Sequence, residues 1–332
     1  MQPSDANGQT ALKVIIIVGI AAFVCMILVA VAMQNAFSTS ERERPDKRPP
    51  QSPFDGQRAF EDLQAMVELG PRPSGSQALE ECRRHIRREL SMAGIEVQEL
   101  RFEAATPLGP MELVNIVGAV RGFRPEVIIL GAHYETEHSA DVPLVGANSA
   151  GAATAWLIEM ARALGAERQG RNVWLCFFDG SAPFAEEDRG LYGSRQFVEH
   201  LRTTGAMENV QAMIGIDMIG DRYLGIQRDY GAPQWLTSAI WSRASGLAFS
   251  RHFQTKGGEW PGDHSPFRAA GVPAVSIADR QYGGSVLEHQ RNWHTANDTI
   301  ERVCPESLQV IGDVVFHALP DIEMHLDVHG PG

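Results

Sequence analysis

After about residue 54, the chain alternates between two hydrophobic periodicities, one typical of amphipathic helices and one of buried strands. In residues 76–94, Leu79, Cys82, Ile86 and Leu90 fall on one helical stripe. Further helices are predicted at 152–164, 191–201 and 234–246, and a last one begins near Pro305. Apolar runs predict strands at 113–120, 126–133, 172–179, 212–220 and 272–279. Because apolar strands alternate with helices, we predict a single α/β domain over residues 54–325, in which helices flank a central, mostly parallel sheet, and a tail at 326–332.

The first 53 residues follow another pattern. Residues 14–33 are apolar and uncharged over twenty positions, the length at which a helix spans a bilayer. We therefore predict an N-terminal transmembrane helix at 14–33, after a short segment at 1–13 and before a flexible, Pro-rich linker at 34–53. A cleavable signal peptide is the alternative, since residues 30–32 have the small-x-small form. The basic residues that follow the apolar stretch would by themselves favour a cytoplasmic body.

Composition excludes some classes of function. The formal net charge is −12, and an acidic body does not suit nucleic acid, which requires a basic face. The sequence contains no glycine-rich phosphate loop of either common spacing, so nucleotide chemistry has no support. Cys25 lies in the apolar stretch and Cys176 in a predicted strand, and we expect Cys82 and Cys304 to be free thiols packed as small hydrophobes.

Polar side chains stand at the ends of three predicted strands. These are His133, Asp179 and Asp217, and Trp293 and His294 lie in a polar loop before the last helix. Taken singly, each has a structural explanation, such as a helix cap or a hydrogen-bonded core histidine. Because the carboxyl ends of parallel strands meet at one edge of a sheet, together they predict a catalytic metal centre there.

Eight segments in order carry a resemblance to a known family. They are "GPRPSGS", "ILGAHYET", "VGANSAGAATAWLIEMARAL", "FFDG", "LYGSRQF", "GIDMIG", "GDHSPFRAAGVPAV" and "NWHTANDT". The chain resembles the glutaminyl cyclases and their relatives, the co-catalytic zinc aminopeptidases. The resemblance implies a zinc-aminopeptidase-like fold with a mixed sheet and a metal pocket at the strand ends. It also implies action on peptide N-termini, closed to pyroglutamate with one zinc by the cyclases and cleaved with two by the aminopeptidases.

The resemblance carries over onto some site residues. His133 stands at the position of the first histidine ligand, Asp217 at a carboxylate ligand and His294 at the last histidine ligand. Trp293 matches a substrate-pocket position, and Asp263 matches a pocket carboxylate that is our candidate catalytic residue. Some family members carry an N-terminal anchor and face the secretory lumen or periplasm. We therefore expect a single-pass membrane protein with its body on the extracytoplasmic side.

Other site residues depart from the family pattern. Ser149 replaces a metal-binding Asp, Ser181 replaces the Glu that acts as general acid/base, and Ala182 replaces a Glu ligand. Glu135 replaces the Asp that orients the first histidine, which is a milder change. Hydroxyl and methyl groups do not supply the charge that holds zinc, so we expect zinc to bind weakly or not at all. Loss of the proton-transfer carboxylate would separately slow turnover by about 10²–10⁴-fold.

Three hypotheses follow from these residues. The first, which we favour, is a non-catalytic binding module, a pseudoenzyme tethered at a membrane. The second is an active cyclase or aminopeptidase that holds a single metal through a rearranged His133, Asp217 and His294, or through acids that swing in from residues 186–188. The third is a serine hydrolase in which Ser149 is the nucleophile, because "ANSAG" imitates a nucleophile elbow.

Deletion of residues 1–52 is expected to leave a soluble, folded body, because the apolar stretch and the linker contribute nothing to the predicted core. Solubility and the far-ultraviolet circular dichroism of the truncated chain check this expectation. An insoluble product, or one without helical signal, would place the domain boundary elsewhere.

Overall fold

The computed structural model describes residues 52–139, 142–185 and 187–331, all of which belong to one compact unit. The predicted transmembrane helix at 14–33 lies outside the described residues, as does most of the linker. Within the described ranges, no helix is both long enough and apolar enough to cross a membrane. The described cysteines, Cys82, Cys176 and Cys304, are buried free thiols, as expected.

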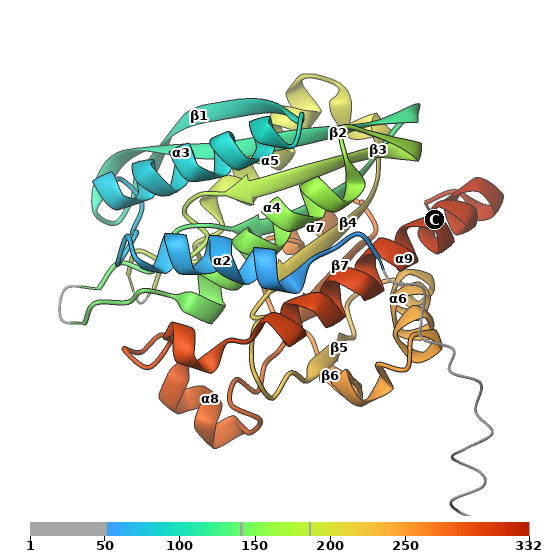
Figure 1. Cartoon of the computed structure of the whole chain (residues 1–332). Helices are drawn as coiled ribbons and strands as arrows, with labels where there is room; N and C mark the ends of the chain where they lie inside the picture. The colour runs from blue at the N-terminus through green and yellow to red at the C-terminus, as the bar shows by residue number, and fades with distance from the viewer. Residues whose placement is uncertain (1–51, 140–141, 186, 332) are drawn as a thin grey trace, which may run out of the picture. The chain divides into compact units, whose positions relative to one another are not determined.

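A five-stranded mixed sheet forms the centre of the unit (Figure 1). Its strands are β1 (Glu96–Thr106), β2 (Gly109–His133), β3 (Glu167–Phe178), β4 (Val210–Asp217) and β7 (Ala274–Ala278). The order along the main path is β1-β2-β4-β7, and β3 pairs with β2. β1 is antiparallel to β2, whereas β2, β4 and β7 run parallel to one another. The predicted α/β domain with a mixed, mostly parallel sheet is confirmed.

The long strand β2 differs from the expectation. The runs 113–120 and 126–133 were predicted as two strands, but they form one element that bends between them. Both halves pair with β3, one on each side. Along the first half the partners descend, from Ile116 facing Phe177 to Val120 facing Val173. Along the second half they ascend, from Ile128 facing Val173 to His133 facing Phe178. The chain therefore reverses around β3 without leaving the sheet, and the second half delivers His133 to the parallel edge.

Helices cover both faces of the sheet. One layer contains α2 (Gly56–Val67), α3 (Gln77–Met92), α4 (Ala152–Leu164) and α9 (Pro305–His329), of which α2, α4 and α9 stand in front of the sheet in Figure 1. The opposite layer contains α5 (Tyr192–Thr203) and the short α7 (Ser265–Ala269), which pack with β2 and β7 around a second apolar cluster. The sheet is thus buried on both sides, which explains its nearly continuous apolar strands.

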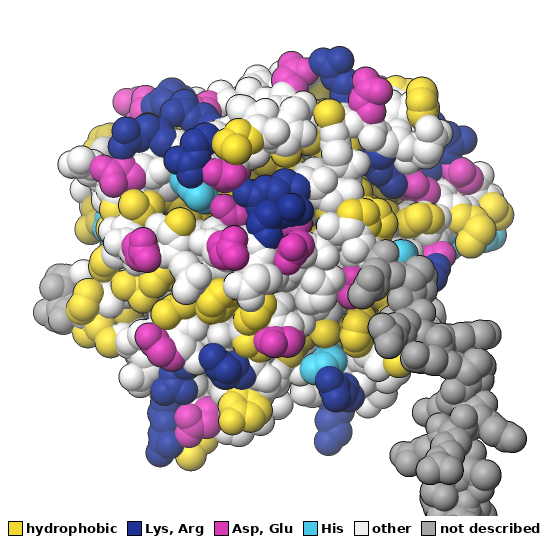
Figure 2. All heavy atoms as spheres, viewed as in Figure 1, with side chains coloured by type: hydrophobic (Ala, Val, Ile, Leu, Met, Phe, Trp, Pro, Cys, Tyr) yellow, Lys and Arg dark blue, Asp and Glu magenta, His cyan; other side chains and the backbone are white. Residues whose placement is uncertain are grey.

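Smaller elements complete the unit. They are α6 (Gln234–Gly246), which packs against α9, the short α8 (Val286–Asn292), and a two-stranded sheet of β5 (Ile226–Asp229) and β6 (Phe253–Gly258), whose β5 lies beside β7. On the face viewed in Figure 2, acidic and basic side chains are interspersed, with hydrophobic side chains between them. That face therefore carries no extended patch of one charge sign.

Replacement of Gly312 by Ala is expected to destabilise the body by about 1–3 kcal/mol through overpacking. Gly312 lies in α9, and a methyl group there would come within 2.3 Å of the Phe54 ring. Phe54 is buried, and its ring lies 5.8 Å from that of Trp156, which limits its room to move. Urea denaturation measures the change.

Gly246→Ala is the matched control, since a methyl group at that exposed helix end meets no heavy atom within 4 Å. We expect this control to be neutral or slightly stabilising. Equal unfolding midpoints for the two variants would show that Phe54 moves aside without cost.

Candidate functional site

A pocket of about 310 Å³ opens at the carboxyl ends of the parallel strands. Its lining includes eight of the residues singled out in the sequence: His133, Ser149, Ser181, Ala182, Asp217, Asp263, Trp293 and His294. The register explains the convergence, because Gly131 of β2 faces Gly215 of β4, and Asp217 of β4 faces Ala278 of β7. The structure therefore brings together the positions that the resemblance assigned to one site.

Asp179 is the exception, since its side chain belongs to the buried interior behind the pocket. It accepts hydrogen bonds from the Ser74 hydroxyl at 2.5 Å and from the Val114 N–H at 3.0 Å, and Arg83 lies 3.5 Å away. Asp179 thus connects the end of β3 to β2 and to the segment before α3. The Asp179 carboxylate therefore has a structural role. Its position at the end of a strand had suggested a place in the metal centre, which the structure does not give it.

His133 is paired with Glu135. Its Nδ1 lies 3.2 Å from the Glu135 backbone oxygen and 3.6 Å from the Glu135 carboxylate, while its Nε2 lies 4.0 Å from Asp217. Burial lowers the pKa of His133, but the Glu135 charge, with Asp217 and Asp263 nearby, outweighs it and raises the pKa to about 10. The surrounding acids therefore favour the protonated imidazole.

Glu135 also holds the turn that follows β3. Its Oε1 accepts the backbone N–H groups of Ser181 at 2.6 Å and Ala182 at 2.9 Å. The Ser181 hydroxyl donates to Asp263 at 2.6 Å. Burial raises the pKa of Asp263 to about 6, although His133 and the Ser181 hydroxyl partly oppose this shift. Glu135 thus fixes the backbone of Ser181 and Ala182, and Asp263 fixes the Ser181 side chain.

Asp217 and Arg280 form an ion pair inside the pocket. Arg280 Nη1 lies 3.3 Å from Asp217 Oδ2, and the two side chains are 16% and 27% exposed. Arg280 follows β7 by two residues, and its guanidinium lies over the Trp260 ring, 5.8 Å from the centroid. The sequence analysis missed Arg280, whose only signal was its place just after an apolar strand.

His294 lies at the rim of the pocket with its own acidic partner. Its Nδ1 is 2.8 Å from Glu137, and its ring packs 3.8 Å from that of Trp293. The backbone of His294 has a φ of 57°, which is uncommon outside glycine and requires support from its surroundings. Glu137 is a second residue that the sequence reasoning missed.

Ser149 lies in a short π-helical turn, Ala147–Gly151, at the start of α4. The Asp298 carboxylate accepts hydrogen bonds from the backbone N–H of Asn148 at 2.7 Å and from that of Ser149 at 3.1 Å. A hydrolase would need a histidine base hydrogen-bonded to the Ser149 hydroxyl, and among the described residues no histidine makes this bond. This arrangement favours a structural role for the "ANSAG" turn.

Comparison with known proteins gives the same fold and family. The sequence pattern of peptidase family M28 matches residues 115–319, well over half of the chain. The chain belongs to peptidase family M28. Its resemblance to glutaminyl cyclases and zinc aminopeptidases is therefore confirmed.

Among solved M28-like structures, a glutaminyl cyclase from an Acidobacteriales bacterium has a TM-score of 0.78 and 30% identity, covering 85% of this chain and 99% of that one. A Zn-dependent exopeptidase from Parabacteroides distasonis shares the fold, with a TM-score of 0.72 and 23% identity over 82% of this chain and 99% of that one. Aminopeptidase YwaD of Bacillus subtilis is 26% identical over 66% of this chain. The chain spans only 46% of the length of YwaD.

Family M28 membership implies a zinc cofactor, so the retained positions can be tested as a ligand set. His133 Nε2 lies 4.0 Å from Asp217 Oδ1, but Asp217 is paired with Arg280, and His294, which bonds Glu137 through Nδ1, offers only its Nε2. Zinc binding by side chains requires three or four donors that converge on one point. In the part of the chain that the structure describes, these three side chains do not form such a set. The M28 pocket thus keeps ligand-type residues in an arrangement that does not fit zinc.

Of the loop acids at 186–188, residue 186 lies outside the described residues, and Asp188 is engaged within its own loop. Asp188 accepts hydrogen bonds from the Phe184 N–H at 2.9 Å and from the Tyr192 hydroxyl at 3.0 Å. It therefore closes its own loop, and its oxygens are engaged away from the pocket.

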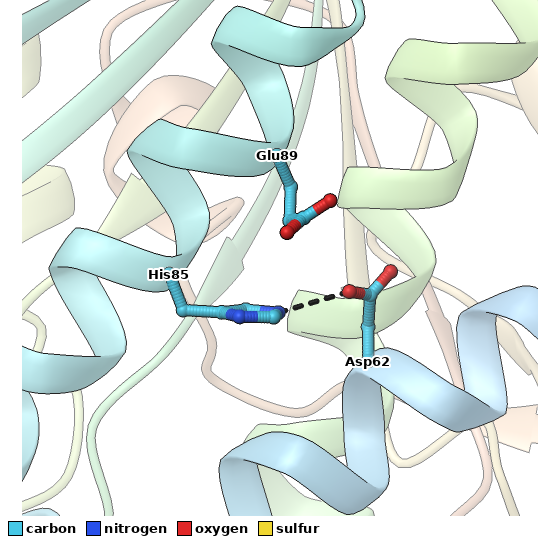
Figure 3. A group of neighbouring side chains, drawn as sticks. All are labelled: Asp62, His85 and Glu89. Atoms are coloured by element: carbon cyan, nitrogen blue, oxygen red, sulfur yellow. Dashed lines mark hydrogen bonds and ion pairs between the residues drawn. The ribbon is translucent and has the colours of Figure 1, made fainter.

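A different triad has ligand-type atoms within 4.8 Å of one another: Asp62, His85 and Glu89, on α2 and α3 (Figure 3). His85 Nε2 lies 2.9 Å from Asp62, and Arg162 bridges Asp62 at 2.5 Å and Glu89 at 2.8 Å. The guanidinium already supplies the positive charge that a metal would bring. This cluster is an ion-pair network that joins α2, α3 and α4.

Asp279, the neighbour of Arg280, makes stability depend on pH. The side chain is fully buried and accepts the N–H groups of Gly225 at 2.7 Å and Gln281 at 2.8 Å. Burial raises the pKa of Asp279 to about 7, and these hydrogen bonds oppose the shift only partly. The native state therefore holds this proton over a pH range in which the unfolded chain has already lost it, so stability falls as pH rises through that range.

The free energy of unfolding of the parent is expected to fall between about pH 5 and about pH 8. In Asp279→Asn this fall should be smaller by about 2 kcal/mol, because the amide does not titrate. Urea denaturation at the two pH values provides the measurement. Glu208→Gln, at an exposed carboxylate, should leave the pH dependence unchanged. A variant at Asp279 that keeps the full parental slope would mean that another buried acid is responsible.

Proposed function

We propose that this chain is a pseudoenzyme of family M28, a membrane-tethered module that binds peptide N-termini without zinc-dependent turnover. The observation that carries the proposal is the ion pair between Arg280 and Asp217, which occupies the carboxylate at a retained ligand position. Ser149 and Ala182 add no carboxylate to replace it. His294 bonds Glu137 through Nδ1 and keeps Nε2 as a single remaining donor.

The acid/base function is also weakened in this proposal. Ser181 occupies the position of the proton-transfer Glu, and its hydroxyl donates to Asp263. Asp263 and Glu135 are the carboxylates near that position, and both are buried and engaged by hydrogen bonds from Ser181. General acid/base catalysis is worth about 10²–10⁴-fold, so turnover by the family reaction would be slow even where substrate binds.

The pocket retains features that suit a ligand. Its volume lies at the lower end of the range for small-molecule sites, large enough for one or two terminal residues of a peptide. Trp260 and Trp293 offer apolar surface, and the Glu137 carboxylate, which is 29% exposed and bonds His294 through one oxygen, offers negative charge to an amine. A free peptide N-terminus combines an amine with a side chain, which is the chemistry that these walls accept.

Residues 14–33 would anchor the module as a single-pass helix, with the body on the extracytoplasmic side. The uncharged apolar stretch of twenty residues supports the anchor. The orientation is inferred from the resemblance, since some family members carry such an anchor and face the secretory lumen or periplasm, and it goes against the basic residues that follow the stretch. The anchor would keep the pocket near the membrane surface, where it meets the N-termini of neighbouring chains.

Three measurements on the purified full-length chain test the proposed function. After incubation with zinc and desalting, elemental analysis is expected to find clearly substoichiometric metal. A peptide that begins with Gln is expected to bind, by fluorescence anisotropy, more tightly than its N-acetylated counterpart, while pyroglutamate formation stays at the uncatalysed rate. Trp293→Ala should weaken the peptide complex without unfolding the chain. Stoichiometric zinc together with rapid pyroglutamate formation would establish an active enzyme instead.

A further inference from the structure

Arg280 places a fixed positive charge at a family metal position. Its Nη1 lies 3.3 Å from Asp217 Oδ2, on the carboxylate that the resemblance assigns to metal binding. The other Asp217 oxygen lies 4.0 Å from His133 Nε2. Asp217 is therefore flanked by two basic side chains, and within the described residues it belongs to no cluster of three metal-ligand side chains.

The fold holds Arg280 in this place by three means. The register sets Asp217 opposite Ala278, so the residues just past β7 emerge beside the end of β4. The backbone N–H of Arg280 donates to the Gln227 side chain on β5, which fixes the start of the loop. The guanidinium lies over the Trp260 ring, an arrangement that stabilises a cation.

We propose that Arg280 is a metal-excluding residue, whose guanidinium takes at Asp217 the place that a divalent cation takes in zinc-dependent relatives. This inference deepens the proposed function and rests on it. Arg280 acts in two ways: it engages the carboxylate oxygen that a metal would need, and it repels a second positive charge in a partly buried pocket. A guanidinium stays protonated throughout the physiological pH range, so the exclusion is permanent.

The loss of metal binding then has two causes: the acids missing at positions 149 and 182, and the positive charge of Arg280. Restoration of carboxylates at positions 149 and 182 alone would return ligands to the pocket but leave its built-in cation. The loss of metal binding would then be only partly reversed. This consequence separates the role of Arg280 from the simple absence of ligands.

The test compares zinc affinities in a background that carries Ser149→Asp and Ala182→Glu, by competition with a chromogenic chelator on the full-length chain. We expect this double variant to bind zinc more tightly than the parent. Addition of Arg280→Gln should tighten zinc binding at least about tenfold further, because it removes both the ion pair and the repulsion. Arg280→Lys, which keeps the charge, should tighten it much less.

Arg189→Gln in the same background is the matched control, since Arg189 also lines the pocket but is exposed. It should change zinc affinity less than about threefold, because solvent screens its charge. Equal effects of Arg280→Gln and Arg189→Gln would overturn the proposal. Should Arg280→Gln not fold, Arg280→Met keeps the contact with Trp260 and carries the same expectation. Loss of folding in both variants would also count against the proposal, because Arg280 would then belong to the scaffold.

Failure of this inference is distinct from failure of the proposed function. Zinc retained by the parent chain would refute the proposed function whatever Arg280 does. A parent without zinc, combined with no effect of Arg280→Gln in the double variant, would leave the proposed function in place and remove only the role of Arg280.

Discussion

The parallel pairing of β2, β4 and β7 is the constraint on which the pocket depends. Parallel strands end at a common edge, so three separate stretches of sequence deliver His133, Asp217 and Arg280 to one place. The helices on both faces bury the sheet and leave this edge as the region where polar side chains gather. Residues just past each strand end therefore set part of the chemistry of the pocket, and loop residues such as Asp263 and His294 supply the rest.

Charge balance then determines what those residues do. A pocket rich in acids needs positive charge, which a metal ion supplies in a zinc enzyme. Here the chain supplies it from within: Arg280 faces Asp217, His294 faces Glu137 and His133 faces Glu135. Each pair lowers the cost of burying its carboxylate. The pair with Arg280 also occupies the Asp217 oxygen that a metal would require, whereas the two histidine pairs involve Nδ1 and leave Nε2 as a donor.

Much of the fold could be predicted from the sequence, and for identifiable reasons. Periodicity located the strands that end at His133 and Asp217, because those strands are apolar on both faces. The meeting of these residues with His294 followed from the resemblance to a known family. The bend of β2 was not predicted, since nothing local in residues 121–125 shows that both halves join the same sheet.

The pairing of the site residues could not be read from the sequence. Arg280 and Glu137 lie in irregular loops, and 63 positions separate Arg280 from its partner Asp217 along the chain. Periodicity carries no information on such contacts, which depend on the path of a loop and on side-chain rotamers. Asp179 shows the converse, because its strand-end position looked functional, yet its side chain lies in the buried scaffold.

The bonds around Ser181 limit the charge that this turn can hold. Glu135 accepts the backbone N–H of Ser181, and Asp263 accepts a hydrogen bond from its hydroxyl at 2.6 Å. A carboxylate in place of the hydroxyl would lie beside these two in a buried space, where like charges repel strongly unless a cation balances them. The neutral side chain at position 181 therefore matches a pocket whose balancing charge comes from the chain itself.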